Sequence, residues 1–295
     1  MKTAKSKTLK MSLAALMAVT GFGCDKSNSS FSILGASQSF QQSTSSITNQ
    51  QIDILWVVDN SLSMQPFQAN MVTNFNSFIT GFVTNGYDFH LAVTTTDAYK
   101  SETFFTGNAG YSVLRDGVFN PSGASTHSGY PVIDAKTPNI VTNFVFNANQ
   151  GESGSGDERA FSSMLDTLNN PSNSTFHRPG AFLAIIILSD EDDFTDPTRP
   201  EGSWVLRPAG LPDHDYADPN LITEAAVLAQ LDALTGSTST GLRSYNISAI
   251  TVKDTTCLAS HTAAEKADPR MGGTASTIIG QRYIVENGPI LVLTW

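Results

Sequence analysis

The sequence contains few basic residues and few cysteines. Its 295 residues include 17 lysines and arginines against 27 aspartates and glutamates, which gives a formal net charge of −10. A negatively charged protein is not attracted to nucleic acid or to anionic lipid, so we expect neither as a partner. The two cysteines, Cys24 and Cys257, exclude a framework of several disulfides.

Long hydrophobic runs are also missing. The apolar stretch from Met11 to Val19 is too short to span a bilayer, and no later segment reaches about 18 uninterrupted apolar residues. We therefore expect no transmembrane helix. Four lysines precede this stretch and small residues follow it up to Cys24, a pattern typical of a signal peptide over residues 1–23.

The segment around Cys24 predicts a membrane anchor. Gly21-Phe22-Gly23-Cys24 resembles a bacterial lipobox, in which the cysteine is lipidated and becomes the mature N-terminus, although Gly21 stands where leucine is usual. Ordinary cleavage and secretion is the alternative. Residues 24–51 are rich in Ser, Asn, Gln and Thr and predict a flexible tether. We expect a lipoprotein of the bacterial cell envelope, at the cell surface, outer membrane or periplasm.

Apolar runs without polar alternation predict parallel strands that are covered on both faces. The strands are expected at 53–58, 89–96, 181–188, 245–252 and 290–294, with a short edge strand at 103–106. Apolar residues at helical spacing predict helices at 66–84, 157–168, 221–234 and 274–286, with one more between 101 and 149. The expected fold is α/β, a Rossmann-like, doubly wound and mostly parallel sheet flanked by helices over residues 52–295.

Oxygen-bearing side chains follow the first of these strands. Asp59, Ser61 and Ser63 form a D-x-S-x-S pattern directly after Val58. The carboxyl ends of parallel strands are where open α/β sheets bind ligands, and carboxylate and hydroxyl oxygens suit Mg²⁺ or Mn²⁺. The alternative is structural: Asp59 is a turn residue and Ser63 is the N-cap of a helix that opens near Pro66.

The run at 181–188 repeats this arrangement, because it leads directly into Ser189 and Asp190. Two parallel strands that end in oxygen donors favour a binding site. Together the two segments resemble the metal-binding loops of von Willebrand factor A (vWA) domains. The resemblance implies that Asp190 completes the metal shell, usually through water, and that a carboxylate of a protein or glycoprotein partner fills the open position.

The resemblance implies one more ligand, a hydroxyl in a Gly-rich loop. Ser155 in Gly154-Ser155-Gly156 takes the place of the family's usual threonine, and Ser153 lies close enough for the alignment to shift by two residues. The family's domains usually end in a helix. This sequence stops at Trp295, directly after the last expected strand, so either that helix is missing or the strand count is wrong by one.

Two neighbouring segments allow more than one interpretation. The acidic run Glu191, Asp192 and Asp193 is a solvated loop or, with Asp196, part of a second cation site for Ca²⁺. The proline-rich excursion at 194–219 either contributes to a partner-binding surface or has no role.

The expected function is metal-dependent binding or adhesion. The alternatives are a structural envelope protein whose metal stabilises the fold and, least favoured, a metal-dependent hydrolase. No nucleophile elbow, H-E-x-x-H, P-loop or Cys/His pair occurs in the sequence, so we expect no enzyme.

Overall fold

The structure is a computed structural model of the whole chain. It describes residues 51–64, 78–80, 83–84, 86–190, 193–198, 219–237, 243–251 and 290–294. For Ser63, Thr251 and 290–294 only the backbone is described. The predicted signal peptide, lipidation site Cys24, most of the tether, Cys257 and the predicted helix 274–286 lie outside these residues.

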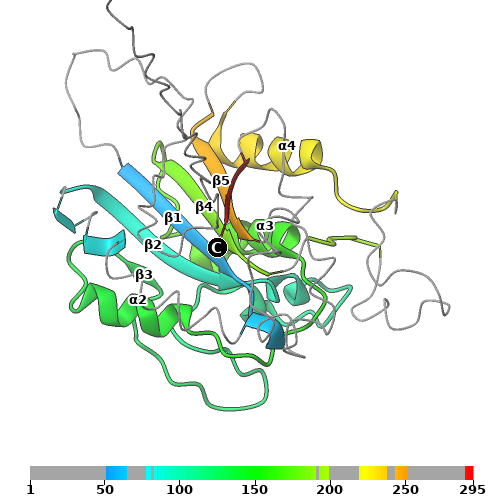
Figure 1. The fold of residues 1–295 in the computed structure, drawn as a ribbon, viewed down its shortest axis with the longest axis horizontal. Helices are drawn as coiled ribbons and strands as arrows, with labels where there is room; N and C mark the ends of the chain where they lie inside the picture. The colour runs from blue at the N-terminus through cyan, green and yellow to red at the C-terminus, as the bar shows by residue number, and fades with distance from the viewer. Residues whose placement is uncertain are drawn as a thin grey trace, which may run out of the picture.

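The centre of the molecule is one twisted sheet of six strands in the order β3-β2-β1-β4-β5-β6 (Figure 1). The strands are β1 (Gln51–Val58), β2 (Asp88–Thr95), β3 (Val132–Ile133), β4 (Phe182–Leu188), β5 (Tyr245–Thr251) and β6 (Ile290–Thr294). All neighbouring pairs are parallel except β2 and β3. The strand order reverses at β1, so the carboxyl ends of β1, β2 and β4 meet where such sheets bind ligands.

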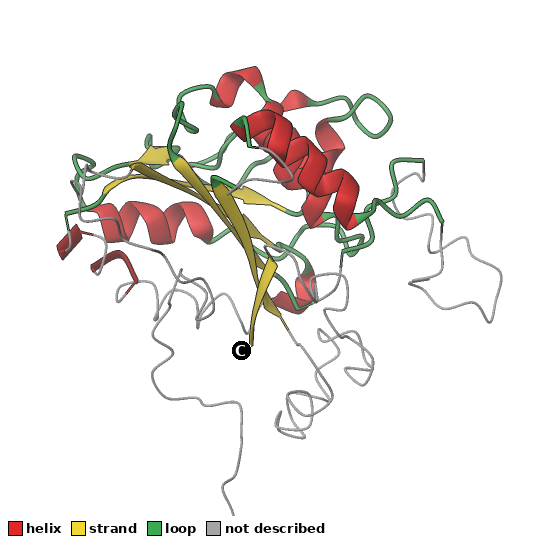
Figure 2. Cartoon of the chain, turned by 90° about the horizontal axis from the view of Figure 1, so that it is seen from above, coloured by secondary structure: helices red, strands yellow, loops and turns green. Residues whose placement is uncertain are grey.

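Helices cover both faces of the sheet (Figure 2). The helices are α2 (Ile140–Ala148), α3 (Ala160–Asn169) and α4 (Glu224–Thr235), and the 3-10 turns are η1 (Leu62–Met64), η2 (Ala98–Ser101), η3 (Ala109–Ser112) and η4 (Pro171–Asn173). Buried residues of α2 pack on one face of the sheet, and those of α3 and α4 pack on the other. This arrangement confirms the predicted Rossmann-like, doubly wound α/β fold.

Strand β1 lies at the middle of the core. Ile54, Trp56 and Val58 point to the α2 face, whereas Leu55 and Val57 point to the α3 and α4 face. The Trp56 ring meets Phe78 and Phe144 edge to face, with centroids 5.8 and 6.2 Å away. Burial on both faces explains why this strand has no polar alternation, since each fully buried side chain contributes about 1.5–3 kcal/mol.

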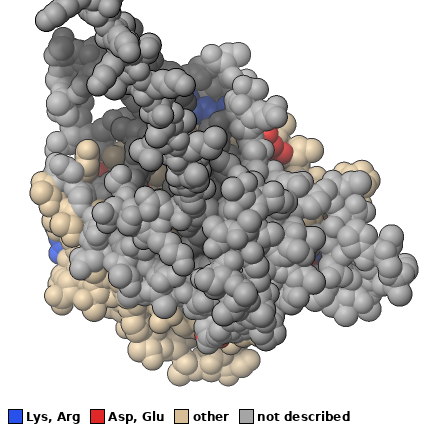
Figure 3. All heavy atoms as spheres, in the orientation of Figure 1, with Lys and Arg blue, Asp and Glu red and all other residues tan. Residues whose placement is uncertain are grey.

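The described atoms that are visible in Figure 3 mostly belong to residues that are neither acidic nor basic, as expected from a chain with 15% charged residues. Among the described helices, none combines the length and the hydropathy needed to cross a membrane.

Most predicted elements are confirmed with shifted ends. Helix α3 begins three residues later than predicted because residues 157–159 form a loop, and α4 begins after Thr223, whose hydroxyl accepts a hydrogen bond from Ala226 N. The predicted last strand is β6, the final element among the described residues. Of the predicted helix 66–84, residues 78–80 and 83–84 are helical and the rest lies outside the described chain.

The predicted edge strand at 103–106 is wrong. That segment makes consecutive turns, with hydrogen bonds from Phe105 N to Glu102 O and from Thr106 N to Lys100 O. The Phe105 ring packs against Tyr99 at 4.8 Å, which holds the segment against the domain rather than along a strand. The edge strand is instead β3, which pairs antiparallel with β2 over two residues.

An ion-pair cluster joins β1, β2 and β4 at the amino ends of the strands. The Arg178 guanidinium lies 2.7 Å from the Asp53 carboxylate and 2.5 Å from the Asp88 carboxylate, and Arg178 N also donates to Asp53 at 2.6 Å. Burial alone would raise the pKa of Asp53. Hydrogen bonds from His177 and Arg178 outweigh burial, so the pKa lies below its ordinary value of 3.8.

We expect Arg178→Met to lower the free energy of unfolding by about 3 kcal/mol at neutral pH, because it leaves a buried carboxylate without its cation. A depressed folded-state pKa stabilises the protein above the unfolded value, and this contribution is lost as the pH falls through the folded value. The difference between wild type and variant should therefore shrink below about pH 4 in urea titrations.

Arg243→Met is the matched control, because Arg243 pairs with Asp232 at a more exposed position, where its side chain is 25% accessible. It should cost less than about 1 kcal/mol. Equal costs for the two variants at neutral pH would show that the Asp53 cluster has no special role in stability.

Candidate functional site

The D-x-S-x-S loop begins where β1 ends. Asp59 is fully buried, and its backbone N–H donates to Leu188 O of β4 at 2.9 Å. One carboxylate oxygen accepts from Ser61 N at 2.8 Å, and the other accepts from the Ser189 hydroxyl at 2.7 Å. Asp59 therefore acts as a turn residue, as the structural alternative predicts. Its second oxygen also joins the loop after β1 to the end of β4.

The rest of this loop forms η1, whose last residue, Met64, is buried in the core. Ser61 is 3% exposed, whereas Leu62, the next residue, is 56% exposed. Ser63 lies within η1. The alternative in which Ser63 caps a helix near Pro66 concerns a segment beyond Met64 that lies outside the described residues.

The end of β4 brings Asp190 to the same edge of the sheet. Asp190 is fully buried and follows Ser189, the residue that donates to Asp59. Ser189 N in turn donates to Ile250 O of β5 at 3.2 Å. Asp59 and Asp190 are thus brought to the same edge of the sheet, where β1 and β4 end.

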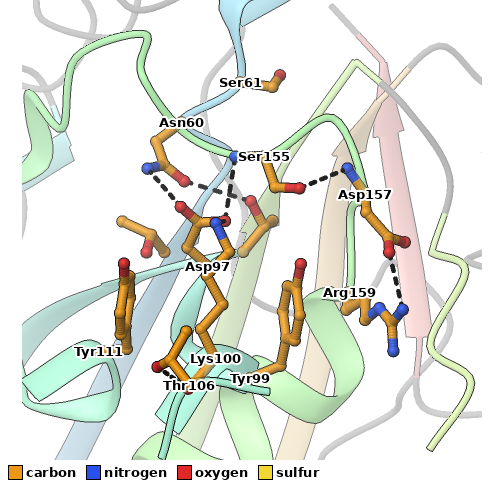
Figure 4. A network of polar contacts seen from close by, with 12 residues as sticks. Asn60, Ser61, Asp97, Tyr99, Lys100, Thr106, Tyr111, Ser155, Asp157 and Arg159 are labelled. Atoms are coloured by element: carbon orange, nitrogen blue, oxygen red, sulfur yellow. Dashed lines mark hydrogen bonds and ion pairs between the residues drawn. The ribbon is translucent and has the colours of Figure 1, made fainter. Parts of the chain in front are cut away.

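The Gly-rich loop lies directly against the D-x-S-x-S loop. Gly154 N donates to Asn60 O at 2.8 Å, and Ser155 follows it (Figure 4). A Cβ on Gly154 would lie 2.5 Å from Asn60 Cγ and 2.6 Å from Asn60 O, so only glycine allows this approach. The Ser155 hydroxyl accepts from Asp157 N at 3.1 Å, which fixes its position in the loop.

A third aspartate, at the end of β2, was not predicted as a site residue. Asp97 accepts from Ser155 N at 3.2 Å and from Asn60 Nδ2 at 3.4 Å, so it contacts both loops (Figure 4). Lys100 Nζ lies 3.0 Å from the same carboxylate. The signal for Asp97 was available, because it follows a buried parallel strand as Asp59 and Asp190 do.

A buried arginine locks the Gly-rich loop to the segment after β4. The Arg159 guanidinium lies 4.8 Å from the Tyr99 and Phe105 ring centroids, donates to Asp157 at 2.7 Å and donates to Asp196 O at 2.8 Å. Because the guanidinium and its ion pair with Asp157 are buried, these contacts stabilise this position of the loop.

The acidic run after β4 has a structural role that neither interpretation anticipated. Asp193 is fully buried, accepts from Phe161 N at 2.9 Å in the first turn of α3, and accepts from the backbone and hydroxyl of Thr195. The solvated-loop interpretation is therefore wrong for Asp193. Its hydrogen bond from Phe161 N caps the first turn of α3 from outside the helix. A second cation site for Ca²⁺ in this run stays a prediction. Glu191, Asp192 and most of the excursion at 194–219 lie outside the described residues.

The electrostatics of the site are dominated by Asp59. Burial raises the pKa of Asp59, hydrogen bonds from Ser61 and Ser189 oppose the rise, and the charge of Asp97 adds to it. A carboxylate in such surroundings is stabilised by a nearby cation. The donor set of two carboxylates with serine hydroxyls matches the hard-oxygen preference of Mg²⁺ and Mn²⁺, which keep several waters.

The described residues contain no group of three or more His, Cys, Asp or Glu side chains that could hold a metal ion. The candidate set is not such a group, because it contains only two carboxylates and its other ligands are serine hydroxyls. In this set, Asp59, Ser61, Ser155 and Asp190 come from three loops at one edge of the sheet, and the position of the Ser63 side chain stays a prediction.

The fold and the site together define a doubly wound α/β domain with oxygen-bearing side chains at the carboxyl edge of its sheet. Neither a scan against protein-family models nor a search of curated proteins gives a match. Solved structures that overlap include proximal thread matrix protein 1 from the mussel byssus, with 11% identity over 70% of this chain and 39% of that chain at a TM-score of 0.31.

A second overlap is with the pilus adhesin SpaC from Lactobacillus rhamnosus GG in its open conformation, with 14% identity over 68% of this chain and 24% of that chain at a TM-score of 0.35. The chain thus spans well under half of either protein. Both TM-scores lie below 0.5, and the assignment of the fold rests on the strand order and the covering helices.

Gly154→Ala should lower the free energy of unfolding by about 1–3 kcal/mol, because the new methyl group forces the Gly-rich loop away from Asn60. Gly156→Ala is the control in the same loop, since a Cβ there meets nothing within 4 Å. It should stay within about 0.5 kcal/mol of wild type. Urea denaturation measures both, and equal stabilities would contradict the close packing of the two loops.

Proposed function

We propose that the protein is a cell-envelope binding protein whose vWA-type domain holds Mg²⁺ or Mn²⁺ and recognises a carboxylate of a protein or glycoprotein partner. Asp59, Ser61, Ser63, Ser155 and Asp190 are the proposed ligands, directly or through water. The observation that supports this most strongly is the pair of contacts that bring three loops together: Ser189 to Asp59 at 2.7 Å, and Gly154 to Asn60 at 2.8 Å.

Residues of the chain would supply both the negative charge and the fixed oxygen positions needed to bind an ion. Asp59 and Asp190 supply negative charge in a buried setting, where a cation is attracted more strongly than in water. The hydrogen bonds of the loops hold the oxygens in place before any ion arrives, which reduces the entropy lost on binding. When bound, the ion would supply a Lewis-acidic position for an oxygen of the partner.

The positions of two described histidines favour a binding role over a catalytic one. His90 and His177 both approach Asp53, with Nδ1 atoms 3.9 and 3.3 Å from its carboxylate, at the opposite end of β1 from the site. Among the proposed ligands, Asp59, Ser61 and Ser155 already take part in hydrogen bonds within and between the loops. Such groups are suited to hold an ion more than to transfer protons.

Isothermal titration of Mg²⁺, Mn²⁺ and Ca²⁺ into the metal-stripped, full-length protein tests this proposal. We expect one ion per chain, and we expect Ser61→Ala with Ser63→Ala to weaken its binding at least about tenfold. The matched control is Ser122→Ala with Ser172→Ala, which removes two exposed hydroxyls elsewhere. Wild-type protein that binds none of the three ions would contradict the proposal.

Circular dichroism in EDTA separates the proposal from a purely structural metal. A binding protein should stay folded without the ion, because its core and loop contacts are made by the chain itself. A structural metal site should unfold or lose several kcal/mol of stability on chelation, since the binding free energy is then folding free energy.

The proposed anchor is the lipid on Cys24, supported by the lysine-rich and apolar segment before it and the polar tether after it. Cys24→Ser should move the protein from the membrane fraction to the soluble fraction of cells that express it, because about 0.8 kcal/mol is lost for each CH₂ of lipid that no longer enters the bilayer. An unchanged distribution would contradict lipidation at Cys24.

A further inference from the structure

Asp97 connects two of the three loops that carry the proposed ligands. It follows β2 and is 6% exposed. One of its oxygens accepts from Ser155 N at 3.2 Å, and the other accepts from Asn60 Nδ2 at 3.4 Å. Ser155 is a proposed ligand and Asn60 follows the proposed ligand Asp59, so a carboxylate that could itself bind a cation lies beside the site.

Lys100 neutralises this carboxylate. Its ammonium lies 3.0 Å from Asp97 Oδ1, and the residue is 8% exposed. Figure 4 shows the Lys100 side chain between the rings of Tyr99 and Tyr111, with its nitrogen directed at Asp97. The nitrogen lies 6.0 Å from the Tyr99 centroid and 5.7 Å from the Tyr111 centroid. Flanking rings and a buried partner fix the ammonium in this position.

The backbone of Lys100 is fixed as well. Its carbonyl accepts from Thr106 N at 3.2 Å and from the Thr106 hydroxyl at 2.6 Å. The guanidinium of Arg115 also interacts electrostatically with Asp97, but its hydrogen bonds go to the carbonyls of Gly110 and Tyr111 and to the Thr95 hydroxyl. Among the described residues, Lys100 is therefore the cation in ion-pair contact with Asp97.

We propose that Lys100 determines which cation the site prefers, by keeping Asp97 neutralised and out of the ligand set. Asp97 is then a positioning residue that joins the two loops, and the site offers two carboxylates, Asp59 and Asp190. Ca²⁺ takes more oxygen ligands than Mg²⁺ and binds more tightly as carboxylates are added. This inference rests on the proposed function, since it concerns the selectivity of the same site.

A double-mutant cycle tests this inference in the full-length protein with Lys100→Met, Asp97→Asn and the two together. Calorimetric titrations with Mg²⁺, Mn²⁺ and Ca²⁺ give the affinities, and circular dichroism in EDTA checks the fold of each variant. Lys136→Met, which removes an exposed lysine, is the matched control.

The two single variants should change affinity in opposite directions. Lys100→Met leaves Asp97 anionic and should raise the Ca²⁺ to Mg²⁺ affinity ratio at least about tenfold. Asp97→Asn removes the carboxylate that pairs with the Lys100 ammonium and should lower the affinity for each of the three ions about tenfold. The double variant, which lacks both charges, should return close to wild type.

The outcomes separate the two proposals. Failure of the wild type to bind any of the ions would overturn the proposed function itself. If the wild type binds and Lys100→Met changes the affinity ratio no more than Lys136→Met does, the selectivity inference is wrong.

If Lys100→Met does not fold in EDTA, Asp97→Asn is compared with the double variant instead. These two proteins differ only in the side chain at position 100, so the comparison tests the effect of Lys100. The double variant should bind Mn²⁺ about tenfold more tightly than Asp97→Asn. Equal affinities would overturn the inference.

Discussion

The burial of Asp59 is the constraint on which the site depends. A carboxylate without water must find hydrogen-bond donors, and Asp59 finds them in its own loop at Ser61 and across the sheet at Ser189. The hydrogen bond from Ser189 to Asp59 therefore joins the ends of β1 and β4. The parallel arrangement makes this possible, because it brings both strand ends to one edge. Two further contacts, Gly154 to Asn60 and Asp97 to Ser155, then add the Gly-rich loop.

The pKa values of the buried aspartates shift in opposite directions at the two ends of the sheet. At the amino ends, Asp53 has Arg178 as a partner, and its pKa is lowered despite burial. At the carboxyl ends, burial raises the pKa of Asp59, and the charge of Asp97 adds to the rise. A paired buried carboxylate serves stability, whereas one whose charged form is disfavoured is typical of a functional site. This contrast between the two ends of β1 is consistent with the proposed cation site at Asp59.

The sequence was sufficient for the strands and for the loops of the site because their signals are local. Unbroken apolar runs identify β1 and β4; Asp59 follows β1 directly, and Asp190 follows β4 after Ser189. Features that depend on distant contacts were not predictable. Asp193 lies in an acidic run and becomes a cap only because α3 begins beside it. The pairing of Asp97 with Lys100 depends on the short turn η2, and β3 has only two residues in which to show a pattern.

The central claim is that one divalent ion binds between Asp59, the Gly-rich loop and Asp190. Anomalous diffraction from crystals of the protein grown with Mn²⁺ tests it most directly, since manganese can be located without reference to the chain. The account predicts one anomalous peak at the carboxyl ends of β1 and β4, about 2.0–2.3 Å from oxygens of the proposed ligands or their waters. An absent peak, or a peak away from this edge of the sheet, would contradict it.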